Sequence, residues 1–426
     1  MLKDRAFRSL WIAQTVSLFG TQASVVIIPL LALGALDATA FQMGLLGSAE
    51  SLAVLILGLW VGTVADRFPR RAVMVTANLL RLVLIGLIPL AYALDALSIP
   101  LLFALIFLVG ALTLLYESAL SSHVVSAFDR SSLPKVNSYM EGSNAVSEVA
   151  GPGLGGVLVQ FLGAPLALVA DVCSYVVSTV LLLGSGEQKK GEEEKDSEEA
   201  TDPDEQESVK SVLSGITWAF SHPILRPVIV SASHFNFFTS LFFAVYTFYV
   251  VKELGFSPLL VGLASAAGGL GGVLSAMSAA AFMNRFRTRL LYTVSLAVPA
   301  VGAFLIPASE MTSSTLLQFL AVATGQFLWS FSIVVNLVMS ETIKQMVTPT
   351  HMIGRVTSAM RFTTLGFEPV GAIVGGTLST LLSPTAALVI AASGLATSIV
   401  WVISNRHLGT YDVNAAEPVT AGDSRA

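Results

Sequence analysis

Charged residues are scarce in this sequence. Asp, Glu, Lys and Arg make up 12% of the 426 residues, whereas 54% of the residues are hydrophobic and the mean hydropathy is +0.76. Soluble globular proteins contain about 25% charged residues. A soluble fold of this length needs more polar surface than these residues supply. The composition therefore excludes an ordinary water-soluble enzyme.

Cysteine and histidine are almost absent as well. Cys173 is the single cysteine, which excludes a disulfide framework and a cysteine-cluster metal site. The five histidines show no metal-ligand spacing, so a zinc site is not expected. No G-x-x-x-x-G-K-[ST] loop occurs, which excludes ATP-driven transport by this chain alone. A G-x-G-x-x-G pattern at 151–156, with Asp171 downstream, lies inside an apolar run instead of after a strand. We therefore predict no metal and no cofactor. Without a basic patch that contains aromatic residues, nucleic acid is not an expected partner.

Long apolar stretches make up most of the sequence. A helix needs about 20 apolar residues to cross a bilayer, and backbone groups in lipid must be paired within helices. The twelve stretches lie near 10–34, 43–65, 72–94, 99–121, 136–160, 164–184, 225–250, 258–282, 289–308, 314–340, 355–380 and 383–404. The predicted fold class is thus an all-α membrane protein with twelve transmembrane helices.

Basic residues mark alternate connections between these stretches. The first set holds fourteen Lys and Arg residues, from Lys3 to Arg406, and the other set holds only Lys252. Because basic loops stay in the cytoplasm, both termini and the central loop are predicted to be cytoplasmic in a multi-pass cell-membrane protein. The first stretch exceeds the 7–15 residues of a typical signal-peptide core, so it is interpreted as a retained helix.

One polar segment divides the chain. Residues 187–210 contain eleven acids and four lysines, a composition typical of a disordered tether; a regulatory or partner-binding role is the alternative. The predicted domains are an N-terminal six-helix bundle at 1–185, an acidic linker at 186–210, a C-terminal six-helix bundle at 211–405 and a disordered cytoplasmic tail at 406–426. A short interfacial helix is expected near 209–220, which carries Trp218 and Phe220.

The two halves repeat each other. Residues 136–156 align with 356–376 at an offset of 220, and Glu148, Gly151, Gly155 and Gly156 have identical counterparts. The basic turn at 66–71 has an echo at 284–289. Two matched six-helix bundles are typical of transporters built from internal repeats.

The first of these turns carries a recognisable motif, formed by Gly62, Asp66, Arg67, Arg70 and Arg71. A carboxylate such as Asp66 can cap a helix N-terminus, and the arginines can pair with it or with lipid phosphate. The pattern resembles the G-x-x-x-D-R-x-x-R-R/K signature of the major facilitator superfamily. In the second half the match is degraded, because Asn284 replaces the acid.

A second motif lies in the fifth stretch and comprises Gly151, Pro152, Gly155 and Gly156. It resembles the GxxxGPxxGG motif of the drug-exporting branches of that superfamily, with Ser147 in place of the first glycine. A proline bends the helix, and glycines allow a neighbouring helix to approach closely. The resemblance implies that this bend biases the side to which a central cavity opens; a generic packing seam is the alternative.

Ionisable residues within the predicted spans are candidates for proton coupling, since an unpaired charge in lipid is unfavourable by several kcal/mol. They are Glu50, Arg81, Glu117, Glu148, Asp171 and Glu368. Arg81 lies about 15 Å along its helix from Arg71, and Glu117 or Glu148 could pair with it. A carboxyl group in an apolar cavity binds a proton more readily than one in water. Each acid alone could instead form a structural ion pair or a helix cap. Neutralising Glu148 or Glu368 is expected to weaken energised export in a folded protein.

The resemblance also suggests which residues line the cavity, since in this superfamily they come mainly from helices one, four, seven and ten. The polar and aromatic candidates are Gln14, Gln22, Tyr116, His234, Asn236, Gln326, Trp329 and Asn336, beside Phe238, Phe242 and Phe243. Apolar walls with a few hydrogen-bonding groups suit an amphipathic ligand.

The sequence most resembles the macrolide-efflux and enterobactin-exporter-like branch, given residues 220–226 (FSHPILR) and Glu117 where related exporters often carry arginine. This resemblance implies a monomeric secondary transporter in the lipid bilayer that exports an antibiotic, siderophore or related metabolite in exchange for protons. A lysophospholipid-type carrier and a non-transporting membrane sensor or scaffold are the alternatives.

Overall fold

The computed structural model describes residues 5–128, 132–184, 214–349 and 352–410, with side chains except at 5–6, 58–67, 134 and 409–410. The predicted linker at 186–210 and the tail beyond residue 410 lie outside the described residues. The side chains of Asp66 and Arg67 and the surroundings of Gly62 also lie outside the described part of the structure.

The N-terminal half consists of six long helices. They are α1 (Arg5–Ala35), α2 (Ala40–Arg67), α3 (Arg70–Ala93), α4 (Ile99–Ala127), α5 (Leu133–Leu162) and α6 (Ala164–Gly184). Helices α5 and α6 are joined by Gly163 alone, whose φ of 77° suits glycine.

The C-terminal half begins with a helix over residues 214–221, which overlaps the predicted interfacial helix. The remaining elements are α8 (Leu225–Phe248), the π-helical turn η1 (Tyr249–Glu253), α9 (Pro258–Arg285), α10 (Thr288–Ala308), the 3₁₀ turn η2 (Ser309–Met311), α11 (Thr315–Val347), α12 (Ile353–Leu365), α13 (Glu368–Leu381), α14 (Pro384–Thr397), α15 (Val400–Ile403) and α16 (Arg406–Thr410). The short helix α16 falls inside the segment predicted to be a disordered tail.

The prediction of an all-α membrane protein is confirmed. In the described part of the chain, eleven helices are long and apolar enough to cross a membrane. The predicted span at 355–380 is instead the pair α12 and α13, broken at residues 366 and 367. Pro369 explains the break, because it has no N–H to donate to the carbonyl four residues earlier.

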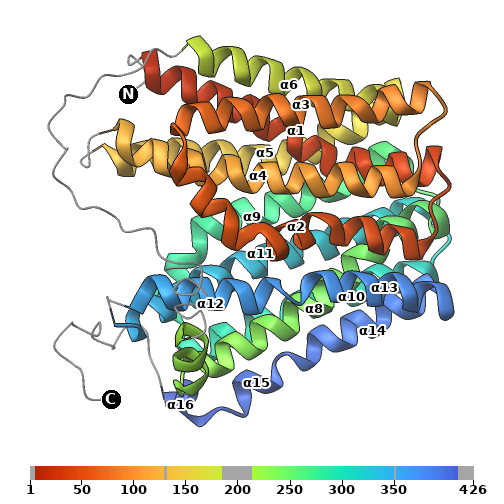
Figure 1. Cartoon of the computed structure of the whole chain (residues 1–426). Coiled ribbons are helices and arrows are strands. Elements are labelled where there is room, and N and C mark those ends of the chain that lie inside the picture. Colours follow the sequence, from red (N-terminus) through yellow and green to blue (C-terminus); the bar gives the residue numbers. More distant parts are fainter. Residues whose placement is uncertain (1–4, 129–131, 185–213, 350–351, 411–426) are drawn as a thin grey trace, which may run out of the picture.

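The two halves form matched bundles, as the repeat predicted. In the N-terminal bundle α1 packs against α5 and α6, and α4 packs against α2 and α3. In the C-terminal bundle α8 packs against α13 and α14, and α11 packs against α9 and α10. Figure 1 shows the first bundle above the second, with the start of α1 and the short helix α16 both on the left.

We call the end of the molecule where α1 begins and α15 ends the terminal face, and the other end the opposite face. On the opposite face, Thr39, Ser257, Ser314 and Ser383 each accept a hydrogen bond from a backbone N–H in the first turn of the helix that follows. These caps satisfy N–H groups that have no partner within the helix. On the terminal face, the Nδ1 atom of His222 accepts from the N–H groups of Ile224 and Leu225. Burial lowers the pKa of His222, which favours the neutral ring that can accept.

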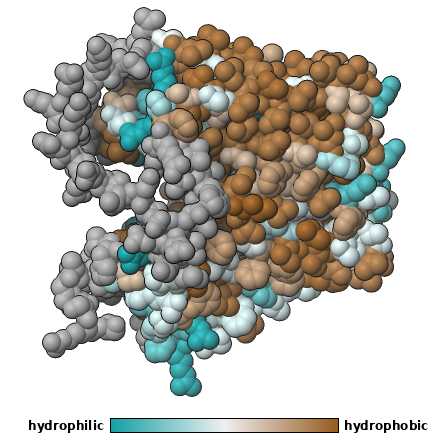
Figure 2. Space-filling model, in the orientation of Figure 1, coloured by the Kyte–Doolittle hydropathy of each residue, from teal (hydrophilic) through white to brown (hydrophobic). Residues whose placement is uncertain are grey.

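The outer surface is suited to lipid. Figure 2 shows a broad hydrophobic region across the middle of the helices, with hydrophilic residues at the edge that forms the opposite face. Large apolar side chains such as Phe161 and Leu381 point outward. A multi-pass membrane protein buries such side chains in the hydrocarbon core of the bilayer.

Candidate functional site

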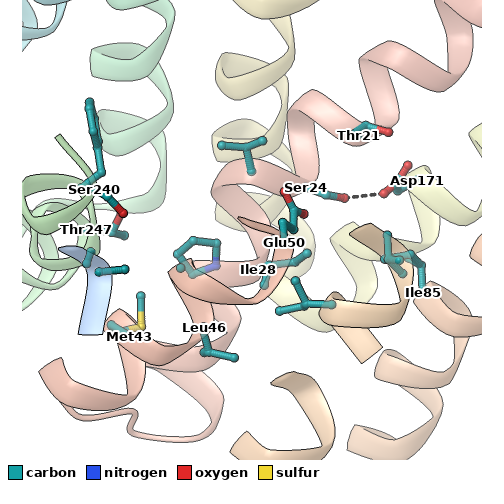
Figure 3. A pocket seen from close by; sticks show the side chains of 18 of the residues that line it. Thr21, Ser24, Ile28, Met43, Leu46, Glu50, Ile85, Asp171, Ser240 and Thr247 are labelled. Carbon is teal, nitrogen blue, oxygen red and sulfur yellow. Dashed lines mark hydrogen bonds between the residues drawn. The ribbon is translucent and has the colours of Figure 1, made fainter. Parts of the chain in front are cut away.

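A cavity of about 280 Å³ lies where the two bundles meet. Its walls come from α1, α2, α3, α4 and α6 of the first bundle and from α8 and α13 of the second. Most of the lining is apolar, and Phe243 contributes an aromatic wall. The polar groups in the lining are Thr21, Ser24, Glu50, Asp171, Tyr175, Ser240 and Thr247. Figure 3 shows Ser240 and Thr247 of α8 on one side of this space, and Ser24, Glu50 and Asp171 of the first bundle on the other.

Two predicted coupling residues, Glu50 and Asp171, line this cavity. Asp171 on α6 is buried, and it accepts hydrogen bonds from Ser24 Oγ at 2.6 Å and Ser174 Oγ at 3.2 Å. Glu50 on α2 is solvent-exposed within the cavity, and Figure 3 places it beside Ser24. One carboxylate is thus held by two hydroxyls, while the other can reach water or a ligand.

Arg81 on α3 is 3% exposed. Its guanidinium stacks over the rings of Tyr116 and Tyr175, with centroids 4.4 and 4.8 Å away, a geometry in which the ring faces attract the cation. It donates hydrogen bonds to Asn78 and Thr113.

The expected ion pair with Glu117 or Glu148 is not formed among the described side chains. The charge of Arg81 nevertheless acts on both Asp171 and Glu117. Glu148 lies exposed on α5 and accepts a hydrogen bond from Asn144 at 3.3 Å. Arg81 is therefore a buried cation whose charge is balanced by carboxylates that it does not contact directly.

A hydrogen bond between the bundles lies next to the cavity. Ser51 Oγ on α2 donates to Glu368 Oε2 on α13 at 2.9 Å. On the terminal-face side of this bond, a second cavity of about 210 Å³ is lined by α2, α4 and α12, and Ser51 and Arg361 are among its residues. The charge of Arg361, in the C-terminal bundle, acts on Glu117 in the N-terminal bundle. Ser51 and Glu368 therefore separate two cavities along the bundle interface.

We expect Ser51→Ala to destabilise the present conformation, since hydrogen bonds to charged groups contribute about 1.5–3 kcal/mol. Cys173 is exposed and would itself react with a maleimide, so it is replaced by serine. Met43→Cys then serves as the probe in the first cavity. Labelling of that probe by an impermeant maleimide added at the opposite face should rise threefold or more. Ser48→Ala is the matched control, because Ser48 Oγ donates to Leu45 O within its own helix. Equal labelling in both variants would mean that the Ser51 bond has no conformational role.

The basic turn binds helix ends in both halves. Arg71 donates to the carbonyls of Leu182 and Leu183 at the end of α6, at 3.0 and 2.7 Å. Arg70 donates to Ser122 O near the end of α4. In the second half, Arg289 donates to Ile403 O at the end of α15. Leu183 O and Ile403 O lie in the last turns of their helices, where carbonyls lack an intrahelical N–H partner. The echo in the sequence therefore corresponds to equivalent bonds of Arg71 and Arg289 in the structure.

The glycines of the α5 motif pack against two neighbouring helices. Gly151 and Gly155 face α1: a Cβ on Gly155 would lie 2.5 Å from Ala23 O. Gly156 faces α9, where a Cβ would lie 2.5 Å from Pro258 O and 2.9 Å from Gly262 Cα. Pro152 is buried beside them.

The counterparts in the second half repeat this division. Gly371 and Gly375 face α8, and a Cβ on Gly376 would lie 2.9 Å from Ala40 O on α2. The two bundles therefore meet backbone to backbone at two symmetric crossings, α5 with α9 and α2 with α13. Gly156 and Gly376 lie on the opposite-face side of the Ser51–Glu368 bond, so the two bundles are in backbone contact on that side.

The eight predicted cavity residues lie elsewhere in this conformation, and none is among the side chains that line the first cavity. Gln14 accepts a hydrogen bond from Tyr116, His234 contacts Gly394 and Thr397, Asn236 donates to Thr364 O, and Asn336 donates to Ser295. Gln22 packs against Gly151, Gln326 packs against Gly268, and Trp329 packs against Phe235, Phe242 and Phe243. Of the predicted phenylalanines, Phe243 lines the cavity.

Sequence reasoning missed the hydroxyl groups Ser24, Ser51 and Ser240, and it missed Arg361 inside a predicted span. Serine is common in membrane helices and often bonds to its own backbone, so its residue type carries little signal. Arg361 could have been found, because it is an ionisable residue within the stretch at 355–380.

Comparison with known proteins is consistent with this architecture. A family model described as the Major Facilitator Superfamily matches residues 10–367. The chain is 26% identical over 363 residues to the multidrug efflux pump Tap of Mycolicibacterium fortuitum, covering 80% of this chain and 82% of the pump. It is 24% identical over 386 residues to the uncharacterized MFS-type transporter YfiS of Bacillus subtilis (strain 168), covering 88% and 87%.

Solved structures share the fold. A bacterial homologue of the iron transporter ferroportin in an inward-facing state superposes with a TM-score of 0.71 at 17% identity, covering 96% of this chain and 99% of that one. The nucleoside transporter NupG superposes with a TM-score of 0.68 at 13% identity, covering 95% and 99%. At these identities the likeness concerns the fold alone.

Proposed function

Because this chain belongs to the Major Facilitator Superfamily and is therefore a membrane transporter and not an enzyme, we propose that it exports a hydrophobic or amphipathic small molecule by proton antiport. The observation that carries this proposal is the cavity between the bundles, where an apolar wall faces two carboxylates, Glu50 and Asp171. The similarity to the multidrug efflux pump Tap supports export as the direction.

The proposed cycle rests on alternating access. The bundles at 1–185 and 211–405 rock about the cavity, and the linker at 186–210 and the tail at 406–426 stay in the cytoplasm. The terminal face is the cytoplasmic side of the cell membrane, in accord with its basic loops. The present conformation is then an occluded one, because the glycine crossings lie toward the opposite face and the Ser51–Glu368 bond separates the first cavity from the cytoplasmic side. A monomer suffices, because the cavity is complete within one chain.

Proton coupling is assigned first to the two cavity carboxylates. A proton that arrives from the opposite face neutralises Glu50 or Asp171. An amphipathic ligand that enters the cavity competes with the proton, because the ligand binds best when Glu50 and Asp171 have lost theirs. Glu368, Glu117 and Glu148 stay as further candidates, Glu368 through its bond to Ser51 and Glu117 through its interaction with Arg361.

The test is transport by the purified protein in liposomes. A radiolabelled panel that comprises a macrolide, a hydrophobic cationic dye, a siderophore and a fluorescent lysophospholipid is offered with an acidic lumen. Uptake of at least one non-lipid compound is expected to exceed that of empty liposomes tenfold and to collapse with an uncoupler. Uptake of the lysophospholipid alone would favour the lipid carrier, and the absence of any proton-dependent flux would favour a sensor or scaffold.

A further inference from the structure

A third cavity lies away from the bundle interface, between α9, α10 and α11, and has a volume of about 400 Å³. Helix α11 packs along both α9 and α10, whereas α9 and α10 scarcely touch each other. The space is therefore a wedge with α11 as its floor. Leu290 and Val294 on its rim are 54% and 43% exposed on the outer surface, so the wedge opens toward the surrounding lipid.

The lining of this wedge is suited to hydrocarbon. It consists of leucine, valine and phenylalanine side chains apart from Ser295 and Ser332. The hydroxyl of Ser295 is already used, since it donates to Tyr292 O and accepts from Asn336 Nδ2. Phe282 stacks on Phe286 and meets Phe331 edge to face, with centroids 6.1 Å apart in both pairs. These rings form a rigid wall.

Positive charge gathers at the mouth of the wedge, on the turn that echoes the basic motif of the first half. Arg70, Arg71 and Arg289 are engaged by helix ends, but Arg285 and Arg287 are exposed and form no hydrogen bond or ion pair with any described residue. Phe286 lies between them in the chain and lines the wedge. From Arg287 to Val298 the helical rise is about 16 Å, enough to accommodate much of an acyl chain.

We propose that this wedge binds an acyl chain of an anionic phospholipid, with the headgroup phosphate at Arg285 and Arg287. The charge complementarity at the mouth selects the headgroup, and the apolar lining takes the chain. In this half of the molecule Asn284 replaces the acid of the motif, which leaves the turn without its own carboxylate and open to an external anion. The site is independent of the cargo cavity, which lies between the bundles.

Native mass spectrometry of the full-length protein, released from nanodiscs into mild detergent, tests this site. The probes are dioleoyl phosphatidylglycerol and the neutral dioleoyl phosphatidylcholine. The parent protein should retain phosphatidylglycerol preferentially. Arg285→Gln with Arg287→Gln should lower that retention by about fivefold for each arginine. Retention of phosphatidylcholine, whose phosphate is balanced by its own choline cation, should fall less. Val298→Phe should fill the wedge and lower retention of both lipids.

Arg226→Gln is the matched control, because Arg226 is another exposed arginine at the terminal face. It should retain phosphatidylglycerol like the parent. The proposal is overturned if the parent holds both lipids equally, or if the double arginine variant holds phosphatidylglycerol as the parent does. It is also overturned if Val298→Phe and the milder Val294→Phe, both shown to be folded by their melting temperatures, retain lipid fully. That last result would place the headgroup on the surface with no chain in the wedge.

Discussion

Gly156→Ala is expected to lower export at least tenfold while the protein stays folded. The new Cβ would lie 2.5 Å from Pro258 O and 2.9 Å from Gly262 Cα, and both of these are backbone atoms that cannot rotate away. Helices α5 and α9 must therefore separate, and the present conformation is destabilised. Tightly packed interfaces switch between discrete states and do not deform smoothly, so a small separation shifts the whole equilibrium. Transport into liposomes and the labelling of Met43→Cys measure the two effects.

Gly153→Ala is the matched control within the same motif. Its Cβ would meet Ala266 Cβ at 3.6 Å, an ordinary contact, so near-parental transport is expected. By symmetry, Gly376→Ala should act like Gly156→Ala, since its Cβ would lie 2.9 Å from Ala40 O. Parental export by both Gly156→Ala and Gly376→Ala would show that backbone contact at these crossings does not limit the cycle.

Glu50→Gln is expected to abolish proton-driven export, with a loss of at least tenfold, while exchange of substrate down its own gradient persists. Glutamine fills the same space and still forms hydrogen bonds, but it cannot bind and release a proton in the cavity. Asp171→Asn should have a similar effect, with Ser24 and Ser174 still able to hold the amide. Energised uptake, substrate counterflow and proton release on substrate addition are the three measurements.

Glu253→Gln provides the control for this second prediction, because Glu253 is an exposed carboxylate at the opposite face. It should export at the parental rate. If Glu50→Gln and Asp171→Asn both support parental uptake under a pH gradient, these carboxylates do not carry the proton. The same assays on Glu368→Gln and Glu148→Gln then decide between the remaining candidates.

The fold was readable from the sequence because its determinants are local or periodic. Each apolar stretch coincides with a helix or a helix pair, and the alignment of 136–156 with 356–376 correctly matched Gly156 with Gly376. The break at residues 366 and 367 was not expected. Pro152 lies within a continuous α5, whereas Pro369 follows a broken segment, so a proline alone does not tell a bend from an interruption.

The cavity was harder to predict, because hydrophobicity does not distinguish the faces of a helix that has lipid on one side and protein on the other. The charge criterion selected Glu50 and Asp171, which do line the cavity. The rule based on helices one, four, seven and ten selected His234 and Asn236, which instead bond to neighbouring helices. Which polar side chain turns inward depends on tertiary packing, and a single sequence does not record it.

The two crossings between the bundles are built from glycine backbone, and the Lys252–Asp37 pair on the same face is solvent-exposed at 3.6 Å, where such pairs contribute little. Van der Waals contact is insensitive to ionic strength. The contact between the bundles at these two crossings should therefore be equally stable at low and high ionic strength. Sensitivity to ions and acidity is then concentrated in the polar groups between the crossings and the terminal face.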